Sequence, residues 1–573
     1  MSGVLRLAPI VTLILMLGPV LAGLLCTVLP AFGYLPSLGA DSFGLSAFAD
    51  LLATPGIRVS IRLSWVTGFA ATACSLLIVI LFCAAWHGTV WFTRLERLLS
   101  PLLSVPHVAV AFGLAFLIAP SGWIMRLLSP WATGYTQPPD VAIIHDPWGL
   151  SLIFGLVLKE VPFLLLMTIA ALGQVDGLKT RLTAMTLGYG AMTGWLKTVL
   201  PQIYPLIRLP VLAVLAFSMS VVDVAMVLAP TTPPPLSVLL LRWMNDPDLS
   251  LRFVASAGAM VQLCLVLAAI AVWLLLERLV AVIGAYWTAA GQRGIRDGWI
   301  RGVTGIGAGS LVVVTGAGLV VLAIWSFAGY WRFPDALPDG WSLRGWQRLD
   351  GQLLTPLVTS AWVAFAATVA AILLVLLCLE NEAENRPFGN RIGSAQPEWQ
   401  RRAVLLLYLP LLVPQVTFLF GMQVLLISTG LDGSAISLVW AHMIFVLPYV
   451  FLSLGDTYRH WDERYKRTGL CLGRAPVSIW LRIKLPMLLR PILVAMAVGF
   501  AVSIGQYLPT ILIGGGRFAT LTTEAVSLAA GGNRRLIGVY SLLQVVLPMF
   551  GFLIAMLLPL VLFRNRRGLQ VNR

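Results

Sequence analysis

The chain contains twelve apolar runs, each long enough to cross a lipid bilayer as an α-helix, for which roughly 20 residues are needed. Only 11% of its 573 residues are charged, against about a quarter in ordinary soluble proteins. This pattern predicts an all-α polytopic membrane protein, and it excludes a soluble enzyme, a disordered scaffold and a secreted disulfide-rich domain. The runs lie near residues 8–29, 64–86, 99–120, 149–172, 207–230, 253–276, 303–326, 356–379, 403–428, 434–455, 491–514 and 537–563.

The positive charges are concentrated on one side of these spans. The formal net charge is +15. If the N-terminus is cytoplasmic, 27 of the 39 Lys and Arg residues fall on the cytoplasmic side, with Arg208 at the start of the fifth span included, and 11 on the opposite side. This asymmetry follows the positive-inside rule, so both termini are expected in the cytoplasm. Because the sequence has no basic tail, the charge does not indicate a nucleic-acid partner.

Short matches in the same order relate the first six spans to the second six. They occur about 285 to 310 residues apart, inside spans 2, 3 and 4 and their counterparts 8, 9 and 10. We therefore expect two parallel six-helix repeats, residues 1–290 and 291–573, related by an axis along the membrane normal. The matches pair Phe69–Thr72 with Phe365–Thr368, Pro106 and Phe112–Gly113 with Pro414 and Phe420–Gly421, and Val161–Phe163 with Leu447–Tyr449.

The clearest repeated element lies in the loop after the fourth span of each half, at residues 176–205 and 456–490. In both copies a Gly is followed by a Trp and then by a Leu-Pro pair. The Gly allows a sharp turn, and the Pro ends or begins a helix. The residues are Gly188, Trp195, Leu200 and Pro201 in the first loop, and Gly473, Trp480, Ile483, Leu485 and Pro486 in the second.

This loop resembles the cytoplasmic EAA loop of ATP-binding-cassette (ABC) importer permeases, in which a Gly precedes nine residues, an Ile, one residue and Leu-Pro. The Glu-Ala-Ala start is replaced by Leu182–Ala184 and Arg467–Gly469. The layout is similar to the fused permeases of the thiamine and ferric-iron importers. The resemblance implies loop helices docked on a cytoplasmic ABC ATPase dimer, a periplasmic solute-binding protein and a location in the bacterial inner membrane. A loop helix lying on lipid headgroups is the alternative.

Residues with catalytic chemistry are sparse. The sequence has no GxxxxGK[ST] phosphate loop, so ATP hydrolysis is expected in a separate subunit. The five His and six Cys residues have no metal-ligand spacing. We therefore expect a transport subunit that is not an enzyme and binds no metal or cofactor of its own, the ATP being used by the partner.

Three charged residues fall inside spans, where charges are costly and normally pair or face a cavity. Lys159 and Asp223 are expected at similar depths, about 5 Å apart along the normal at ~1.5 Å per residue. One interpretation is a structural Lys159–Asp223 ion pair, and the other is a polar lining of the translocation path. The residues that could form such an intramembrane pair or line the translocation path are Lys159, Glu160, Asp223, His107, Gln415 and Gln506.

Two other classes of protein remain as alternatives. An ion-gradient-driven secondary transporter with twelve helices in two halves would need intramembrane acidic residues but no matched docking loops. A membrane-embedded enzyme would need clustered His or Asp residues near one face, which the sequence lacks. The sequence does not identify the solute.

Overall fold

The structure is a computed structural model that describes residues 2–99, 104–294, 298–347, 352–385 and 406–564. These residues form α-helices joined by short loops, with no β-sheet among them. The helices up to residue 289 are α1 (Ser2–Ala31), α2 (Ser46–Ala53), α3 (Ile57–Trp86), α4 (Val90–Leu99), α5 (His107–Ile118), α6 (Trp123–Leu128), α7 (Leu150–Leu172), α8 (Gly177–Thr186), α9 (Ala191–Thr198), α10 (Leu200–Ser220), α11 (Asp223–Leu228), α12 (Leu236–Met244) and α13 (Leu251–Ala289).

The helices after residue 297 repeat this order of long and short elements. They are α14 (Gly298–Phe327), α15 (Arg344–Gln347), α16 (Leu354–Glu384), α18 (Gln415–Ser428), α19 (Ala435–Arg459), α20 (Arg464–Cys471), α21 (Pro476–Ile479), η4 (Trp480–Lys484), α22 (Leu485–Met487), α23 (Leu489–Ile504), α24 (Leu508–Ile513), α25 (Leu521–Ala529) and α26 (Arg534–Leu562).

The described residues contain ten helices that are long and apolar enough to cross a membrane. Two bent helix pairs raise this number to twelve if each counts as one span: 406–412 with α18, bent by 97°, and 476–487 with α23, bent by 72°. The all-α polytopic fold is therefore confirmed. Residues 100–103 of the predicted third span and 403–405 of the ninth lie outside the described residues.

Two prolines mark the places where helices begin inside predicted spans. Pro106 precedes α5 and Pro414 precedes α18, and both have extended backbone angles. Proline restricts the preceding residue and donates no backbone hydrogen bond. As a result the third span begins after Pro106: it was predicted at residues 99–120, and the structure has it at His107–Leu128.

Large apolar side chains cover the outside of the bundle. Leu25 on α1, Leu267 on α13, Val313 on α14 and Leu560 on α26 are each more than half exposed. A soluble monomer rarely exposes so much contiguous apolar surface. These helices are therefore the ones that face the lipid acyl chains.

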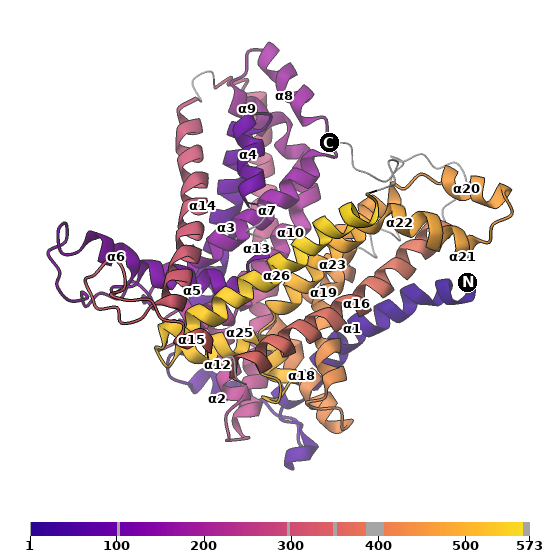
Figure 1. Cartoon of the computed structure of the whole chain (residues 1–573). Helices are drawn as coiled ribbons and strands as arrows, with labels where there is room; N and C mark the ends of the chain where they lie inside the picture. Colours follow the sequence, from indigo (N-terminus) through magenta and orange to yellow (C-terminus); the bar gives the residue numbers. More distant parts are fainter. Residues whose placement is uncertain (1, 100–103, 295–297, 348–351, 386–405, 565–573) are drawn as a thin grey trace.

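The first helix of each half packs against the third span of the other half. α1 lies beside α18, and α14 stands beside α5 (Figure 1). Glycines allow both approaches: a Cβ on Gly421 would collide with the Gly23 carbonyl, and a Cβ on Gly113 would lie 3.0 Å from the carbonyl carbon of Gly318. These are the two glycines that the sequence pairs between spans 3 and 9.

A serine on the second span of each half caps a short helix in the same way. Ser64 Oγ on α3 accepts a hydrogen bond from the backbone N–H of Leu236 at 2.9 Å, where α12 begins. Ser360 Oγ on α16 accepts one from the N–H of Leu521 at 2.8 Å, where α25 begins. Both serines are buried, where water does not reach, so each hydroxyl is the acceptor for a backbone N–H group at the start of its short helix.

Matched hydroxyls also bond the carbonyls freed where the fifth span of each half is interrupted. Ser237 Oγ donates to Val221 O at 2.8 Å, between α10 and α11. Thr522 Oγ1 donates to Ile504 O at 2.6 Å, at the last residue of α23. The expected two-repeat arrangement and its division at residues 290 and 291 stay predictions.

Candidate functional site: coupling loops and an interhelical path

The first Gly-containing loop consists of two short helices, α8 and α9, joined by Leu187–Gly190. Gly188 has φ +84°, a conformation that side-chain-bearing residues rarely adopt. Trp195 on α9 is fully buried and anchors this helix against the bundle. Leu200 and Pro201 begin α10, where proline in the first turn is favoured because no helical N–H partner is lost.

The second loop has the same plan. α20 leads to Gly473, which has φ +73°, and then to α21, η4 and α22. Trp480 begins η4, a five-residue π-helical turn that ends at Lys484. Leu485 and Pro486 begin α22, after which the chain bends by 72° into α23. We call the face of the molecule that carries α8, α9 and α20 to α22 the coupling face.

Each left-handed glycine follows an exposed leucine. Leu187 is 62% exposed and Leu472 is 74% exposed. Two residues earlier, Met185 and Leu470 are each 44% exposed. The loops thus present small apolar surfaces at matched positions at the far ends of both halves (Figure 1). Such surfaces outside the lipid-facing spans are typical of protein contact sites.

The start of the first loop is fixed to the end of α3. Arg181 donates a hydrogen bond from Nη1 to the backbone carbonyl of His87. Burial, and then the positive charge of Arg181, lower the pKa of His87. The neutral form of His87 is therefore favoured, and Arg181 bonds directly to the backbone at the end of the helix.

The intramembrane charges predicted from the sequence gather near the start of α5. Lys159 Nζ on α7 lies 2.6 Å from the carbonyl oxygen of Val105. His107, the first residue of α5, has its Nε2 atom 3.5 Å from Oε1 of Glu160. The His107 ring also lies 4.9 Å from the ring of Phe217 on α10.

Tyrosines of the second half face these carboxylates. Tyr449 on α19 lies within electrostatic range of Glu160, and Tyr507 lies within range of Asp223. Asp223 begins α11 and is buried, with His107 also within range. The candidate carboxylates of the first half therefore lie within electrostatic range of tyrosines of the second half. The Lys159–Asp223 pair stays a prediction.

The uncharged candidates occupy related positions. Gln415 is the first residue of α18, as His107 is of α5, and both follow a proline. Gln506 lies in the interruption between α23 and α24. Leu508 begins α24 as Asp223 begins α11. Counted from the matched carbonyl acceptors Val221 and Ile504, the counterpart of Asp223 is Gln506, so this level carries a charged side chain in the first half and an uncharged polar one in the second.

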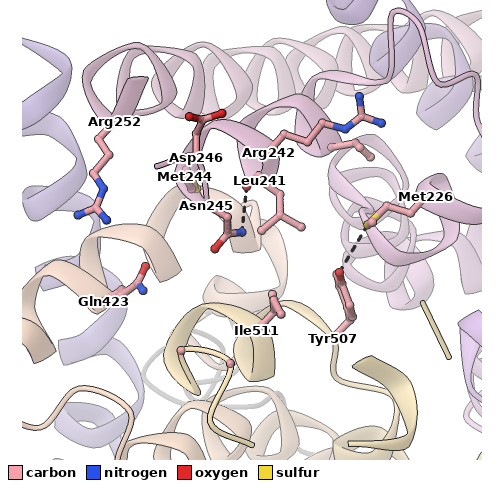
Figure 2. Close-up of a pocket in the computed structure, with 13 residues that line it drawn as sticks. Met226, Leu241, Arg242, Met244, Asn245, Asp246, Arg252, Gln423, Tyr507 and Ile511 are labelled. Carbon is pink, nitrogen blue, oxygen red and sulfur yellow. Dashed lines mark hydrogen bonds between the residues drawn. The ribbon is translucent and has the colours of Figure 1, made fainter. Parts of the chain in front are cut away.

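A cavity of about 610 Å³ opens between the halves, on the side away from the coupling face. Figure 2 shows Arg252 extending toward Gln423, whereas Tyr507 donates a hydrogen bond to Met226 Sδ at 3.6 Å. Nε of Arg252 is buried and has no hydrogen-bond partner among the described residues. The lining residues are Met226, Val238, Leu241, Arg242, Met244, Asn245, Asp246, Arg252, Gln423, Tyr507, Ile511, Gly515 and Gly516.

Sequence reasoning missed two groups of residues. Tyr449 and Tyr507 give no signal because an aromatic residue in a span normally indicates packing. A buried ion pair between Glu380 and Lys484 was also missed, because the eighth span was predicted to end at residue 379 and Lys484 lies in the predicted loop at residues 456–490, where positive charges are expected from the positive-inside rule. The alternating acids at residues 380, 382 and 384, set against that basic loop, are the signal that was available.

Comparison with known proteins gives three relevant relatives, although no family model matches the chain. The inner membrane ABC transporter permease protein YnjC of Escherichia coli K12 is 31% identical over 542 residues, which cover 93% of this chain and 94% of YnjC. The chain belongs to the ABC transporter permeases.

Two shorter matches agree with this family. The molybdenum transport system permease protein ModB of Mycobacterium tuberculosis is 29% identical over 190 residues, 30% of this chain and 68% of ModB. The spermidine/putrescine transport system permease protein PotC of Haemophilus influenzae is 22% identical over 144 residues, 25% of this chain and 56% of PotC. This ABC permease is therefore a multi-pass membrane transport protein, as the sequence predicts.

Proposed function

We propose that this chain is the permease subunit of an ATP-driven, binding-protein-dependent importer of the bacterial inner membrane. Both termini lie in the cytoplasm, together with the coupling face. A cytoplasmic ABC ATPase dimer binds the two loops, and a periplasmic solute-binding protein delivers a small solute to the opposite face. The observation that carries the proposal is the exposed leucine before a left-handed glycine in both loops, at Leu187–Gly188 and Leu472–Gly473.

The path of the solute follows from the cavity and the charges. The solute enters the cavity beside Tyr507 and passes between the halves near Glu160 and Asp223. The names of ModB and PotC assign molybdenum and spermidine or putrescine to those proteins, and no residue pattern assigns a solute to this one. The binding protein encoded beside the permease gene identifies the solute by its ligand.

A double-mutant cycle separates the two roles of the intramembrane charges. If Lys159 and Asp223 form a structural pair, Asp223→Asn lowers the folded yield and adding Lys159→Met restores it, because a lone buried charge is removed. Additive effects on yield, together with loss of uptake, assign the residues to the path instead.

Co-purification with the ATPase encoded beside the permease gene tests the proposal. We expect the double variant Leu187→Glu/Leu472→Glu to insert normally and to retain less than a tenth of the bound ATPase, because both apolar contacts gain a charge. Leu337→Glu, at a 57% exposed residue between α14 and α15, is the matched control and should retain it. If the wild-type chain binds no ATPase and uptake follows an ion gradient, the chain is a secondary transporter.

A further inference from the structure

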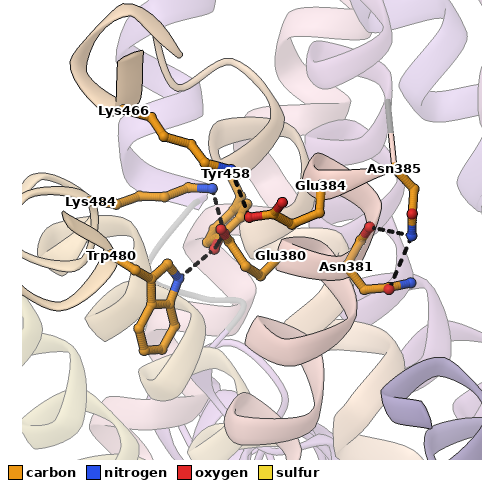
Figure 3. Close-up of polar contacts among 8 residues, drawn as sticks. All are labelled: Glu380, Asn381, Glu384, Asn385, Tyr458, Lys466, Trp480 and Lys484. Atoms are coloured by element: carbon orange, nitrogen blue, oxygen red, sulfur yellow. Dashed lines mark hydrogen bonds and ion pairs between the residues drawn. The ribbon is translucent and has the colours of Figure 1, made fainter. Parts of the chain in front are cut away.

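The second coupling loop is joined to two transmembrane helices by a buried ion pair. Lys484 Nζ lies 2.6 Å from Oε2 of Glu380, close to the end of α16, and both side chains are 5% exposed. Tyr458 on α19 donates its hydroxyl proton to the same Glu380 oxygen. Trp480 Nε1 donates to the Tyr458 hydroxyl at 3.0 Å. Figure 3 shows these groups converging from the loop, α16 and α19.

Two aromatic rings complete the surroundings of the lysine. Its Nζ atom lies 4.1 Å from the ring centroid of Tyr458 and 5.0 Å from that of Trp461. Cations are attracted to ring faces at such distances, most strongly when they are desolvated. The ammonium group is thus held by one carboxylate and two rings, and the carboxylate by two donors. Removal of either charge would leave the other buried and uncompensated.

Two further ion pairs connect the same elements at the surface. Lys466 on α20 lies 2.7 Å from Glu384, and Arg459 on α19 lies 2.9 Å from Glu382. The alternating acids of α16 therefore each bind a cation, two of them from the loop. The Lys466–Glu384 pair is partly exposed, at 20% and 41%, so it is expected to contribute little.

The first coupling loop is attached differently. Lys197 Nζ on α9 donates to the carbonyl oxygens of Trp287 and Gln292, at 2.9 and 2.8 Å, and lies 4.6 Å from the Trp287 ring centroid. Gly190 N–H donates to Arg293 O at 2.8 Å. These partners belong to the end of α13 and the residues after it. The first loop thus joins the second and sixth spans of its half, through His87 at the end of α3 and through the end of α13, whereas the second loop joins the second and fourth.

α16 extends the linkage to the opposite face. Glu380 lies near one end of this helix and Ser360 near the other, about 30 Å apart at ~1.5 Å per residue. Ser360 Oγ holds the first turn of α25 through the Leu521 N–H. A continuous helix therefore connects the buried ion pair at the coupling face with a short helix on the far side.

We propose that Glu380, Lys484 and Tyr458 are positioning residues that make the second loop, α16 and α19 move as one unit, whereas the first loop moves with α3 and α13. The two ATPase contacts then drive different sets of helices in the two halves: the second and sixth spans in the first half, and the second and fourth in the second. This inference rests on the proposed function, because it needs an ATPase that displaces the loops. Displacement of the second loop is transmitted through α16 to α25.

The test uses the double variant Glu380→Gln/Lys484→Met, which leaves no lone buried charge. Glu384→Gln/Lys466→Met removes the partly exposed pair from the same helix and loop and is the matched control. Spin labels are placed on exposed residues of the opposite face, Ser527 on α25 and Asp50 on α2, in a chain whose six cysteines are replaced. The distance between the labels is measured in the complete transporter, with and without vanadate-trapped nucleotide.

We expect the nucleotide-dependent change in the Asp50–Ser527 distance to fall at least twofold in Glu380→Gln/Lys484→Met and to be unchanged in the control. ATPase binding should be kept in both. An unchanged distance response in an assembled Glu380→Gln/Lys484→Met complex overturns the inference. If the wild-type chain binds no ATPase, the proposed function fails instead.

A second, more conservative variant keeps the inference testable if the double variant does not assemble with the ATPase. Tyr458→Phe keeps the ring and both charges but removes the hydroxyl that bridges Trp480 and Glu380. We expect it to assemble and to reduce the distance response measurably. A full wild-type response in Tyr458→Phe, when the double variant does not assemble, also contradicts the inference, because the hydroxyl then transmits nothing.

Discussion

Gly421 on α18 approaches Gly23 on α1 so closely that a Cβ on either glycine would collide with the backbone of the other helix. The same relationship joins Gly113 on α5 with Gly318 on α14. Each contact holds the first helix of one half against the third span of the other. The two halves are therefore interlocked by helices that cross between them, rather than merely placed side by side.

A larger residue at this crossing should separate the helices. We expect Gly23→Leu to destabilise the protein by about 3 kcal/mol or more, since overpacking typically costs about 1–3 kcal/mol and here the obstacle is backbone. Gly18→Leu, one and a half turns earlier on α1 with open space around it, is the control. Melting temperature in detergent measures the difference, and equal melting of the two variants would show that the crossing is not close-packed.

The two matched serine caps, Ser64 and Ser360, should contribute equally to the stability of the protein. Ser64→Ala and Ser360→Ala each leave a buried backbone N–H without its acceptor, which costs about 1–3 kcal/mol. Ser310→Ala, at an exposed position on α14, should change stability very little. Thermal unfolding of the three variants checks this. A large effect of one cap and none of the other would contradict the structural equivalence of the halves.

The free energy of unfolding should depend on pH through Asp146, a carboxylate outside the membrane-spanning segments. Asp146 accepts hydrogen bonds from the N–H groups of Leu150 and Ser151 at 2.8 and 2.9 Å. Burial raises the pKa of Asp146, but these hydrogen bonds outweigh it and hold the pKa below its usual value. The stabilisation is therefore present above the unfolded-state pKa of about 4 and is lost as the pH falls through the lower folded-state pKa.

We expect Asp146→Asn to lower stability by about 1 kcal/mol at pH 7, because the amide keeps only one of the two acceptor oxygens and loses the negative charge. The difference from wild type should shrink as the pH falls below about 4 and through the lower folded-state pKa, where the wild-type carboxyl also becomes neutral. Asp140→Asn, in the exposed loop before it, is the control. A difference in melting temperature that is independent of pH would show that the charge contributes nothing.

The left-handed glycines of the coupling loops should be sensitive to substitution for backbone reasons. Valine at Gly188 or Gly473 is strained by about 1–3 kcal/mol, and we expect reduced ATPase stimulation, with Gly473→Val the more harmful. Gly473→Asn should be milder, because Asn tolerates positive φ. Gly430 has φ +71° and open space but lies on the opposite face. Gly430→Val should therefore leave ATPase stimulation intact; an equal loss would indicate a general folding defect.

Much of the fold was predictable because each span has a local signature. A run of about 20 apolar residues predicts a transmembrane helix directly from the sequence. Likewise, the spacing of Gly188 and Gly473 from the Leu-Pro pairs predicts a turn at each glycine. The sequence matches that predict the repeat include Gly113 and Gly421, which make matched close contacts with Gly318 and Gly23. Each such feature depends on residues close together in the chain.

The relationships that the sequence did not reveal are all long-range. The crossing of α1 to α18 depends on which glycine meets which backbone across almost 400 residues. Lys484 looks like one of many positive-inside charges until Glu380 is seen beside it. The cavity is lined by residues of five helices and of the loops that follow or join them, and its shape follows only from their packing.

Photo-crosslinking from the two loops tests the central claim most directly. A benzophenone label at Leu187→Cys or Leu472→Cys, each in a chain without other cysteines, is illuminated in membranes that contain the ATPase. We predict crosslinks to the ATPase subunit from both positions and none from Leu337→Cys. Crosslinks to lipid alone from both loops would show that these helices lie on the membrane surface, and would contradict the account of an ATP-driven permease.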